Sequence, residues 1–195
     1  MKNINHVIDE FKKLNDVKAI VLSGSRTAKS SDEISDYDIY IYSDKEIDIG
    51  KRTDIAKLFS DKFEINNCFF GPGDEWILRG SDIQIDVMYR SREWIENCVE
   101  NTWIKHYPNV GYSTCFIFNI KFSQILYDTE NWYKSLQDKV SGEYPDELQK
   151  NIINNNLPLL KNKISASFYE QIDKALKRKD YVSLNHRISA FIASY

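Results

Sequence analysis

The spacing of apolar residues near the N-terminus predicts one helix followed by two strands. Residues 4–14 carry apolar side chains at helical intervals, which is typical of a helix that packs one face on a sheet. Residues 17–23 are almost continuously apolar, as expected for a buried strand. In residues 37–43, Ile39 and Ile41 share one face, and the neighbouring positions therefore lie on the other.

The middle of the chain predicts a second helix and further strands. Helical spacing extends over residues 48–62, and a short strand is predicted at residues 63–70. Residues 75–79 and 82–89 have the pattern of a hairpin, because the Gly-Ser pair between them is a recognised two-residue turn.

Beyond this hairpin the pattern is mostly helical. Helices are predicted at residues 93–106 and 132–140, whereas residues 115–125 fit either a helix or a strand. Residues 125–128 indicate one more short strand. After residue 145 the sequence predicts three further helices, at residues 146–160, 164–179 and 181–195. Pro158 predicts a kink or break inside the first of the three. Together the elements predict an α/β (α+β) fold with a helical C-terminal region.

Two aspartates at the start of the second strand are the first sign of chemistry. Asp36 and Asp38 point to the same face, so their charges repel each other unless a cation lies between them. Mg²⁺ is the natural candidate, because it prefers oxygen ligands and keeps phosphate oxygens or water in its other positions. Upstream, Gly24 allows a ligand to approach the backbone closely, and the Ser25 hydroxyl could hold phosphate oxygens.

A third aspartate lies within the second arm of the predicted hairpin. Asp86 stands between Ile85 and Val87, and a carboxylate in the middle of an apolar strand is unusual. Taken alone, Asp86 is as readily explained as a half-exposed carboxylate on a solvated face as by a function.

The stretch from Leu22 to Asp38 resembles the signature of the nucleotidyltransferase superfamily that includes DNA polymerase β and the antibiotic adenylyltransferases. That signature is an apolar residue, Gly-Ser, a loop of about ten residues and Asp-x-Asp on a strand. The small-molecule branch, with the aminoglycoside and lincosamide enzymes, is the most similar. Many of its members carry Arg-Gly shortly after Gly-Ser, whereas this chain has Arg26 at once and Ala28-Lys29 at the position of that pair.

The resemblance implies a mixed nucleotidyltransferase sheet flanked by helices, with a catalytic domain at residues 1–142 and a C-terminal helical region at residues 143–195. It implies that two Mg²⁺ ions and ATP, or another nucleoside triphosphate, are bound. The implied metal-binding and catalytic residues are Asp36, Asp38 and Asp86, with Asp82 as the alternative to Asp86. The implied nucleotide-binding residues are Ser23, Gly24, Ser25 and Arg26.

The resemblance also implies the reaction, in which a nucleoside monophosphate, AMP from ATP, passes to a hydroxyl group of a small molecule such as an antibiotic. Composition agrees with a small acceptor, because a net charge of -3 disfavours broad binding to nucleic acid. We expect no signal peptide and no membrane span, and the three scattered cysteines are expected to be free thiols. A bacterial cytoplasm is the expected setting.

Two other functions stay open at this stage. The same superfamily includes minimal nucleotidyltransferases that act as antitoxins or regulatory modules for a helical ribonuclease partner. The chain ends in an apolar helix, which permits a truncated chain, a homodimer or a helical protein partner. A degenerate member without activity is the third reading, and the retention of all three aspartates speaks against it.

Overall fold

The computed structural model describes residues 2–27, 35–69, 71–163 and 166–195. The chain divides into two compact units. The first unit comprises Met1–Asn97 and Phe118–Ser141, and the second comprises Cys98–Ile117 and Gly142–Tyr195.

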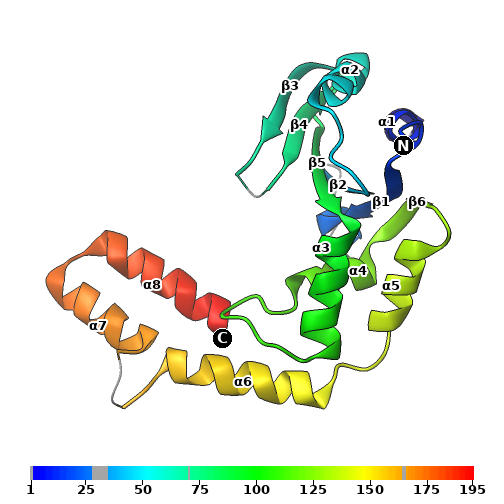
Figure 1. Ribbon diagram of the computed structural model, residues 1–195. Coiled ribbons are helices and arrows are strands. Elements are labelled where there is room, and N and C mark those ends of the chain that lie inside the picture. Colours follow the sequence, from blue (N-terminus) through cyan, green and yellow to red (C-terminus); the bar gives the residue numbers. More distant parts are fainter. Residues whose placement is uncertain (1, 28–34, 70, 164–165) are drawn as a thin grey trace. The chain divides into compact units, whose positions relative to one another are not determined.

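A six-stranded mixed sheet forms the centre of the first unit (Figure 1), in the order β3-β4-β5-β2-β1-β6. Its strands are β1 (Val17–Ser23), β2 (Tyr37–Ser43), β3 (Ser60–Asn67), β4 (Gly73–Leu78), β5 (Gln84–Ser91) and β6 (Gln124–Asp128). Strands β2 and β5 are parallel, whereas the other neighbouring pairs are antiparallel. The sheet and its helices confirm the predicted α/β fold class.

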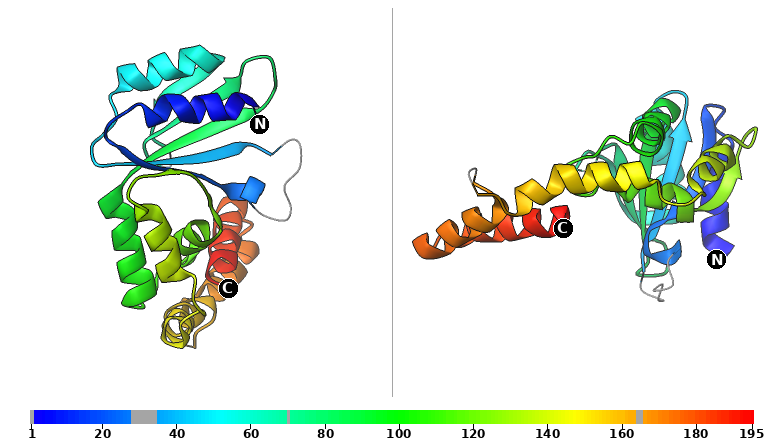
Figure 2. Two further views of the ribbon diagram at one scale, coloured as in Figure 1. Left: turned by 90° about the vertical axis from the view of Figure 1, so that its right-hand side faces the viewer. Right: turned by 90° about the horizontal axis from the view of Figure 1, so that it is seen from below.

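Helices α1 (Lys2–Lys12) and α2 (Ile49–Phe59) lie side by side on one face of this sheet (Figures 1 and 2). The main apolar core lies beneath them, where Phe11 of α1 stacks on Trp76 with 6.0 Å between ring centroids. Ile39 and Ile85 are fully buried in the same core. Because side chains alternate along a strand, Asp38 and Asp86 project from the opposite face.

The opposite face is covered near β1 by α5 (Trp132–Val140). The buried Tyr133 of α5 contacts Tyr42 of β2, with 5.2 Å between ring centroids. Helix α3 (Arg92–Cys98) follows β5 directly and continues into a π-helical turn at Val99–Ile104. Helix α4 (Cys115–Phe122) leads into β6.

The second unit consists mainly of helices α6 (Asp146–Leu160), α7 (Phe168–Arg178) and α8 (Tyr181–Ser194). Its polar centre is the buried Asn156 of α6, which accepts a hydrogen bond from the Gly111 N–H and donates one to the Asn109 carbonyl oxygen. Helix α7 begins with a capping box in which Ser167 and Glu170 satisfy each other's backbone N–H groups. None of the helices in the described ranges is both long and apolar enough to cross a membrane.

Several predicted elements have different limits in the structure. The predicted helix at 48–62 was wrong at its end, because Ser60 already begins β3, where its hydroxyl donates to the Ile77 carbonyl oxygen. The ambiguous stretch at 115–125 is a helix up to Phe122. Helix α6 continues through Pro158, so the expected break is not there. Helix α7 begins at Phe168, and residues 164–165 of its predicted start lie outside the described residues.

Candidate functional site

The two parts of the Gly-Ser and Asp-x-Asp motif meet in the first unit, where β1 ends and β2 begins. The chain leaves β1 through a short 3₁₀ turn at Gly24–Thr27, and Gly24 has a φ of +68°. A Cβ atom on Gly24 would lie 1.8 Å from the Oδ2 atom of Asp38. A side chain at this position would force the Asp38 carboxylate to move, and the positive φ also favours glycine, so the turn packs directly against this carboxylate.

Three of the predicted site residues stand in one row across the sheet. Ser23 of β1 pairs with Asp38 of β2, and Asp38 pairs with Asp86 of β5. Register partners on neighbouring strands share a face, so the two carboxylates project side by side. Both are half-buried, whereas Asp36 is exposed at the residue before β2. The parallel pairing of β2 and β5 thus brings together two aspartates that are far apart in the sequence.

The electrostatics of this row are unfavourable for Asp38. Burial, followed by repulsion from Asp86 and from Asp36, raises the pKa of the Asp38 carboxyl to about 6. Asp86 accepts a hydrogen bond from the Gln84 side-chain amide at 2.9 Å, which orients one of its oxygens. The three aspartates therefore lie near enough to influence one another, and a bound cation would relieve their repulsion.

The structure also places the two alternatives for the third carboxylate. Asp82 lies in the connection between β4 and β5 and is exposed. Asp86 lies within β5 and is the register partner of Asp38.

Sequence reasoning missed Glu75, which pairs with Asp86 from β4 and so extends the acidic row. The signal that could have found Glu75 is its alternation with Trp76 along the hairpin arm.

The phosphate-binding candidates have different surroundings. Ser23 is buried at the end of β1, and Ser25 is exposed. Arg26 donates from Nε to the Asp36 carbonyl oxygen at 3.0 Å, and its guanidinium group lies 3.9 Å from the Tyr37 ring centroid. These contacts hold Arg26 beside the start of β2. Ala28-Lys29, the point of departure from the superfamily pattern, lies outside the described residues.

The donor atoms at this site fit Mg²⁺ chemically. Mg²⁺ in proteins is commonly held by one or two carboxylates, with phosphate oxygens and water in its other positions. Asp38 and Asp86 supply such a pair, and Gly24 leaves the backbone accessible beside them. Within the described parts of the chain, no group of three or more His, Cys, Asp or Glu side chains is arranged so that it could hold a metal ion. Ligands from a bound triphosphate would therefore be needed to complete the coordination.

Comparison with known families agrees with the motif. Residues 5–69 match the family model described as polymerase beta, nucleotidyltransferase. This N-terminal third of the chain includes Gly24, Asp36 and Asp38, whereas Asp86 lies beyond it. A search of curated proteins found no match.

Three solved structures with some similarity are distant in sequence. A nucleotidyltransferase-like protein from Exiguobacterium sibiricum 255-15 is 6% identical over 99% of this chain, with a TM-score of 0.43. This chain spans 54% of that protein's length. A toxin–antitoxin complex with AMP-PNP is 12% identical over 82% of this chain and 96% of its own, with a TM-score of 0.42. Spectinomycin adenyltransferase AAD(9) from Enterococcus faecialis is 12% identical over 97% of this chain and 88% of its own, with a TM-score of 0.37.

Proposed function

We propose that this chain is a Mg²⁺-dependent nucleotidyltransferase that moves a nucleoside monophosphate, AMP from ATP, to a hydroxyl group of a small molecule. An aminoglycoside or lincosamide antibiotic is the proposed class of acceptor. The observation that carries the proposal is the contact of Gly24 with Asp38, with Asp86 in register beside it. The matched family model covers the first two of these residues.

The proposed roles follow from position. Asp38 and Asp86, with the exposed Asp36 just before β2, would hold Mg²⁺. When bound, Mg²⁺ supplies charge stabilisation at the phosphoryl oxygens. The Gly24 turn, with Ser23, Ser25 and Arg26, would bind the β- and γ-phosphates. We propose that the chain consists of a catalytic domain at residues 1–142 and a helical region at residues 143–195.

Asp86 is the proposed proton acceptor. It would take the proton of the acceptor hydroxyl as that oxygen forms a bond to the α-phosphorus, and pyrophosphate would leave in line on the other side. The P–O bond that forms replaces the one that breaks, so the reaction needs no further reactant. The hydrogen bond from Gln84 would keep one Asp86 oxygen oriented during this step.

The direct test is transfer of label from ATP to a panel of aminoglycosides and lincosamides in the presence of Mg²⁺. We expect the wild type to transfer label to at least one acceptor. Asp86→Asn should abolish transfer, whereas Asp82→Asn, a matched change in an exposed residue outside β5, should leave it intact. A folded wild type that modifies no acceptor, or an Asp86→Asn protein with full activity, would contradict the proposal.

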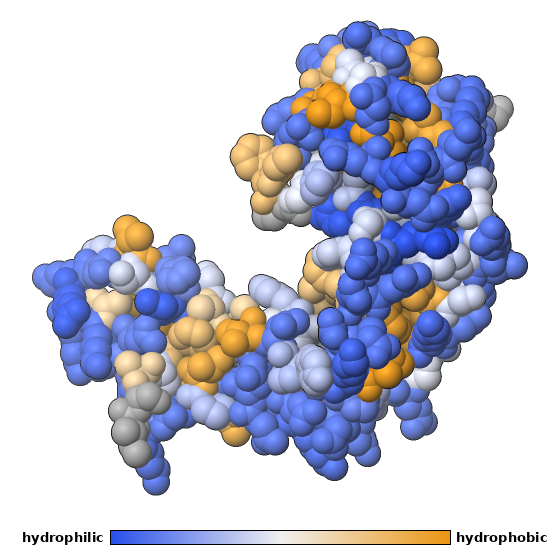
Figure 3. Space-filling model, in the orientation of Figure 1, coloured by the Kyte–Doolittle hydropathy of each residue, from blue (hydrophilic) through white to orange (hydrophobic). Residues whose placement is uncertain are grey.

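A second candidate function, an antitoxin or regulatory module with a helical protein partner, is favoured by the surface of α7 and α8. Large apolar side chains are exposed there, including Val182 at 84% and Ile192 at 66%. Figure 3 shows these helices with orange apolar surface. Transfer of AMP to a co-purified helical protein rather than to any small molecule would favour this function.

A further inference from the structure

The sheet face that carries the aspartates continues into an uncharged row one step further along β2 and β5. Tyr40 lies two residues after Asp38, and Met88 lies two residues after Asp86, so their side chains project from the same face as the carboxylates. Tyr40 and Met88 are also register partners, and both are half-buried. Together they form a small surface, the Tyr40/Met88 patch, which begins about 7 Å from the two carboxylates.

The strands on either side of the patch add no exposed side chain to this row. On the β1 side, Val21 pairs with Tyr40 and is only 1% exposed. On the β4 side, Gly73 pairs with Met88 and has no side chain. The accessible side-chain surface of this row is therefore that of Tyr40 and Met88.

Tyr40 belongs to a packed group of aromatic rings. Its ring centroid lies 6.4 Å from that of Tyr42, and the two rings are nearly parallel, at an angle of 15°. Tyr42 is buried, and its ring packs against Trp132 and Tyr133 of α5, with centroids 5.7 and 5.2 Å away. This support holds the Tyr40 ring in place before a ligand binds, which lowers the entropy cost of binding.

A small cavity extends the patch on the Met88 side. It has a volume of about 70 Å³, and Asp86, Met88, Glu75, Gly71 and Gly73 are among the residues that border it. The two glycines leave the backbone bare at this wall, so a ligand can approach closely. The cavity has room for about two groups of the size of a water molecule. It therefore suits a substituent of a ligand rather than a whole ring.

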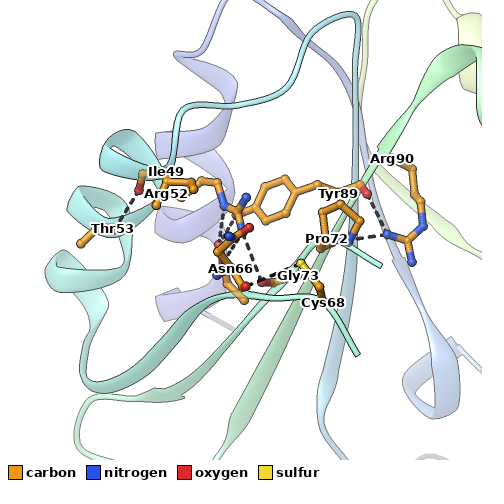
Figure 4. Close-up of polar contacts among 10 residues, drawn as sticks. Ile49, Arg52, Thr53, Asn66, Cys68, Pro72, Gly73, Tyr89 and Arg90 are labelled. Carbon is orange, nitrogen blue, oxygen red and sulfur yellow. Dashed lines mark hydrogen bonds and ion pairs between the residues drawn. The ribbon is translucent and has the colours of Figure 1, made fainter. Parts of the chain in front are cut away.

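Arg90 bounds the patch at its far end. It lies two residues after Met88 on the same face. Figure 4 shows its guanidinium group turned toward Pro72, and its Nη1 atom donates to the carbonyl oxygens of Pro72 and Tyr89 at 3.3 and 2.7 Å. A Cβ atom on Gly71 would lie 2.9 Å from the same Nη1 atom, so the loop before β4 packs on this arginine. The patch is thus bounded by Arg90 at one end and by the carboxylates at the other.

The position of the patch favours the acceptor over the nucleotide. The Gly24 turn, which is proposed to bind the β- and γ-phosphates, lies at the start of β2 beside Asp38. The patch lies in the opposite direction along β2, and it includes the strand of Asp86, the proposed proton acceptor. A hydroxyl group at Asp86 would place the rest of the acceptor molecule over Met88 and Tyr40.

The side chains of the patch favour an apolar surface on the ligand. The methionine thioether and the phenol ring pack well against C–H groups, and neither carries a formal charge. An ammonium group over this patch would lose water without gaining a partner from Tyr40 or Met88, which costs free energy. A ring with an apolar C–H face next to its hydroxyl group fits both requirements.

We propose that the Tyr40/Met88 patch binds the acceptor of the transferase reaction, and that this acceptor is a saturated ring, such as a sugar, with an apolar C–H face beside the reacting hydroxyl group. One small substituent of the ring enters the cavity at Gly73. Of the two antibiotic classes, lincosamides fit better, because their sugar carries no ammonium group, whereas the rings of aminoglycosides carry several. This inference rests on the proposed function, since Asp86 places the reacting hydroxyl group.

The chain offers a specific probe of the patch, because Met1 and Met88 are its only methionines. Protein labelled with ¹³C at the methionine methyl groups gives one NMR signal for each, and the signal that is absent from Met88→Leu belongs to Met88. We expect lincomycin to shift this signal and kanamycin to bind at least about tenfold more weakly. Equal binding of the two compounds, or no shift with lincomycin at about 10 mM, well above a millimolar Kd, would overturn the proposal.

Variants of the patch make the test specific. Tyr40→Ala should weaken lincomycin binding about tenfold, because one apolar contact surface is lost, and Tyr40→Phe should keep it within about twofold of wild type. Ile77→Ala is the matched control, since Ile77 lies on the same face but on the other side of the carboxylate row. Equal losses for Tyr40→Ala and Ile77→Ala would overturn the proposal. If Tyr40→Ala does not fold, Met88→Ala, measured by calorimetry, takes its place with the same expected loss.

Steady-state kinetics separate this inference from the proposed function. Tyr40→Ala should raise the KM for the acceptor about tenfold and leave the KM for ATP within about twofold of wild type. A rise in the KM for ATP instead would assign the patch to the nucleobase, and it would overturn the inference while the transferase activity stands. Lincomycin that binds at Met88 of a wild type that modifies no acceptor would contradict the proposed function and support ring binding at the patch.

Discussion

Two aspartates of the same sheet, Asp74 and Asp38, show opposite solutions to the burial of a carboxylate. Asp74 is only 1% exposed, and it accepts hydrogen bonds from Arg52, from the Tyr89 hydroxyl at 2.6 Å and from the Asn66 N–H at 2.8 Å. Asp38 is half-buried, and its charged neighbours are two further aspartates, which together with burial raise its pKa to about 6. The first carboxylate has its cation within the fold, whereas the described residues provide no ion-pair partner for the second.

We expect this difference to separate a structural acid, Asp74, from the proposed functional acid, Asp38. A buried carboxylate with a permanent partner stabilises the arrangement of the residues around it. A carboxylate that is held near others of the same charge costs stability in the free protein, and such a cost is typical of sites that bind a cation. Gly24 and Asp86 lie beside Asp38, so this cost in stability falls at the residues that the motif predicts to be functional.

The largest effect should come from Asp38→Asn. We expect transfer to fall by about 10⁴-fold or more, since groups that act as one catalytic unit lose most of their effect when one is removed. The melting temperature should stay equal or rise, because the change removes repulsion. Transfer rates and thermal unfolding of the same preparation measure both. A large drop in melting temperature would show that Asp38 is a structural acid like Asp74.

The second largest effect should come from Arg52→Met, which leaves Asp74 buried without its cation. We expect the free energy of unfolding to fall by about 3–5 kcal/mol. Lys51→Met, at the exposed neighbouring position on α2, is the control and should change little. Urea unfolding measures both, and an Arg52→Met protein as stable as the control would remove the contrast between the two aspartates.

Gly24→Ala should have an intermediate effect, mainly on activity. The new Cβ atom would collide with the Asp38 carboxylate, and φ at this position is positive. Displacing a catalytic group by about 1 Å can cost about 100-fold in rate. Gly142→Ala is the matched control, because a Cβ atom there meets nothing within 4 Å. Comparable transfer rates for the two alanine variants would mean that the glycine contact does not set the position of Asp38.

The smallest effect should be a pH dependence of stability in metal-free buffer. The Asp38 carboxyl binds its proton more tightly in the folded chain, with a pKa of about 6, than in the unfolded chain, near 3.8. The stabilisation of the folded chain by this tighter proton binding is therefore fully present below about pH 4, and it is lost as the pH rises through about 6. Because the carboxyl is partly solvated, we expect on the order of 1 kcal/mol.

The measurement for this prediction is the difference in unfolding free energy between wild type and Asp38→Asn across this pH range. Asparagine does not titrate, so the difference isolates the carboxyl from the other acids of the chain. A difference that is constant with pH would show that the Asp38 pKa is not raised. Added Mg²⁺ should reduce the loss above pH 6 if the site binds it.

Elements with strong local signals were predictable from the sequence. The limits of β1, β2 and α5 agree with the apolar pattern and its turn residues. The start of β3 was missed, because Ser60 belongs to a strand through its pairing with β4 rather than through its neighbours in the sequence. Glu75, in contrast, could have been found, because a hairpin that turns at Gly80-Ser81 places Glu75 opposite Asp86.

The candidate site was predictable only in its residue types. The roles of Ser23, Gly24, Ser25, Arg26 and the three aspartates remain predictions, and they depend on a motif rather than on the pattern of apolar positions. The sequence did not reveal that Gly24 touches Asp38, nor that Arg52 and Asp74 form a buried pair, since both depend on how distant segments pack.

The parallel pairing of β2 and β5 has a consequence for how this protein folds during its synthesis on the ribosome. The intervening α2, β3 and β4 must all be synthesised before β5 can dock, and pairs so distant in sequence form slowly. Repulsion between Asp38 and Asp86 therefore begins only when β5 pairs with β2, and it opposes that pairing. A divalent ion present in the cell would neutralise this repulsion, so the Mg²⁺ ion of the proposed reaction would also assist folding.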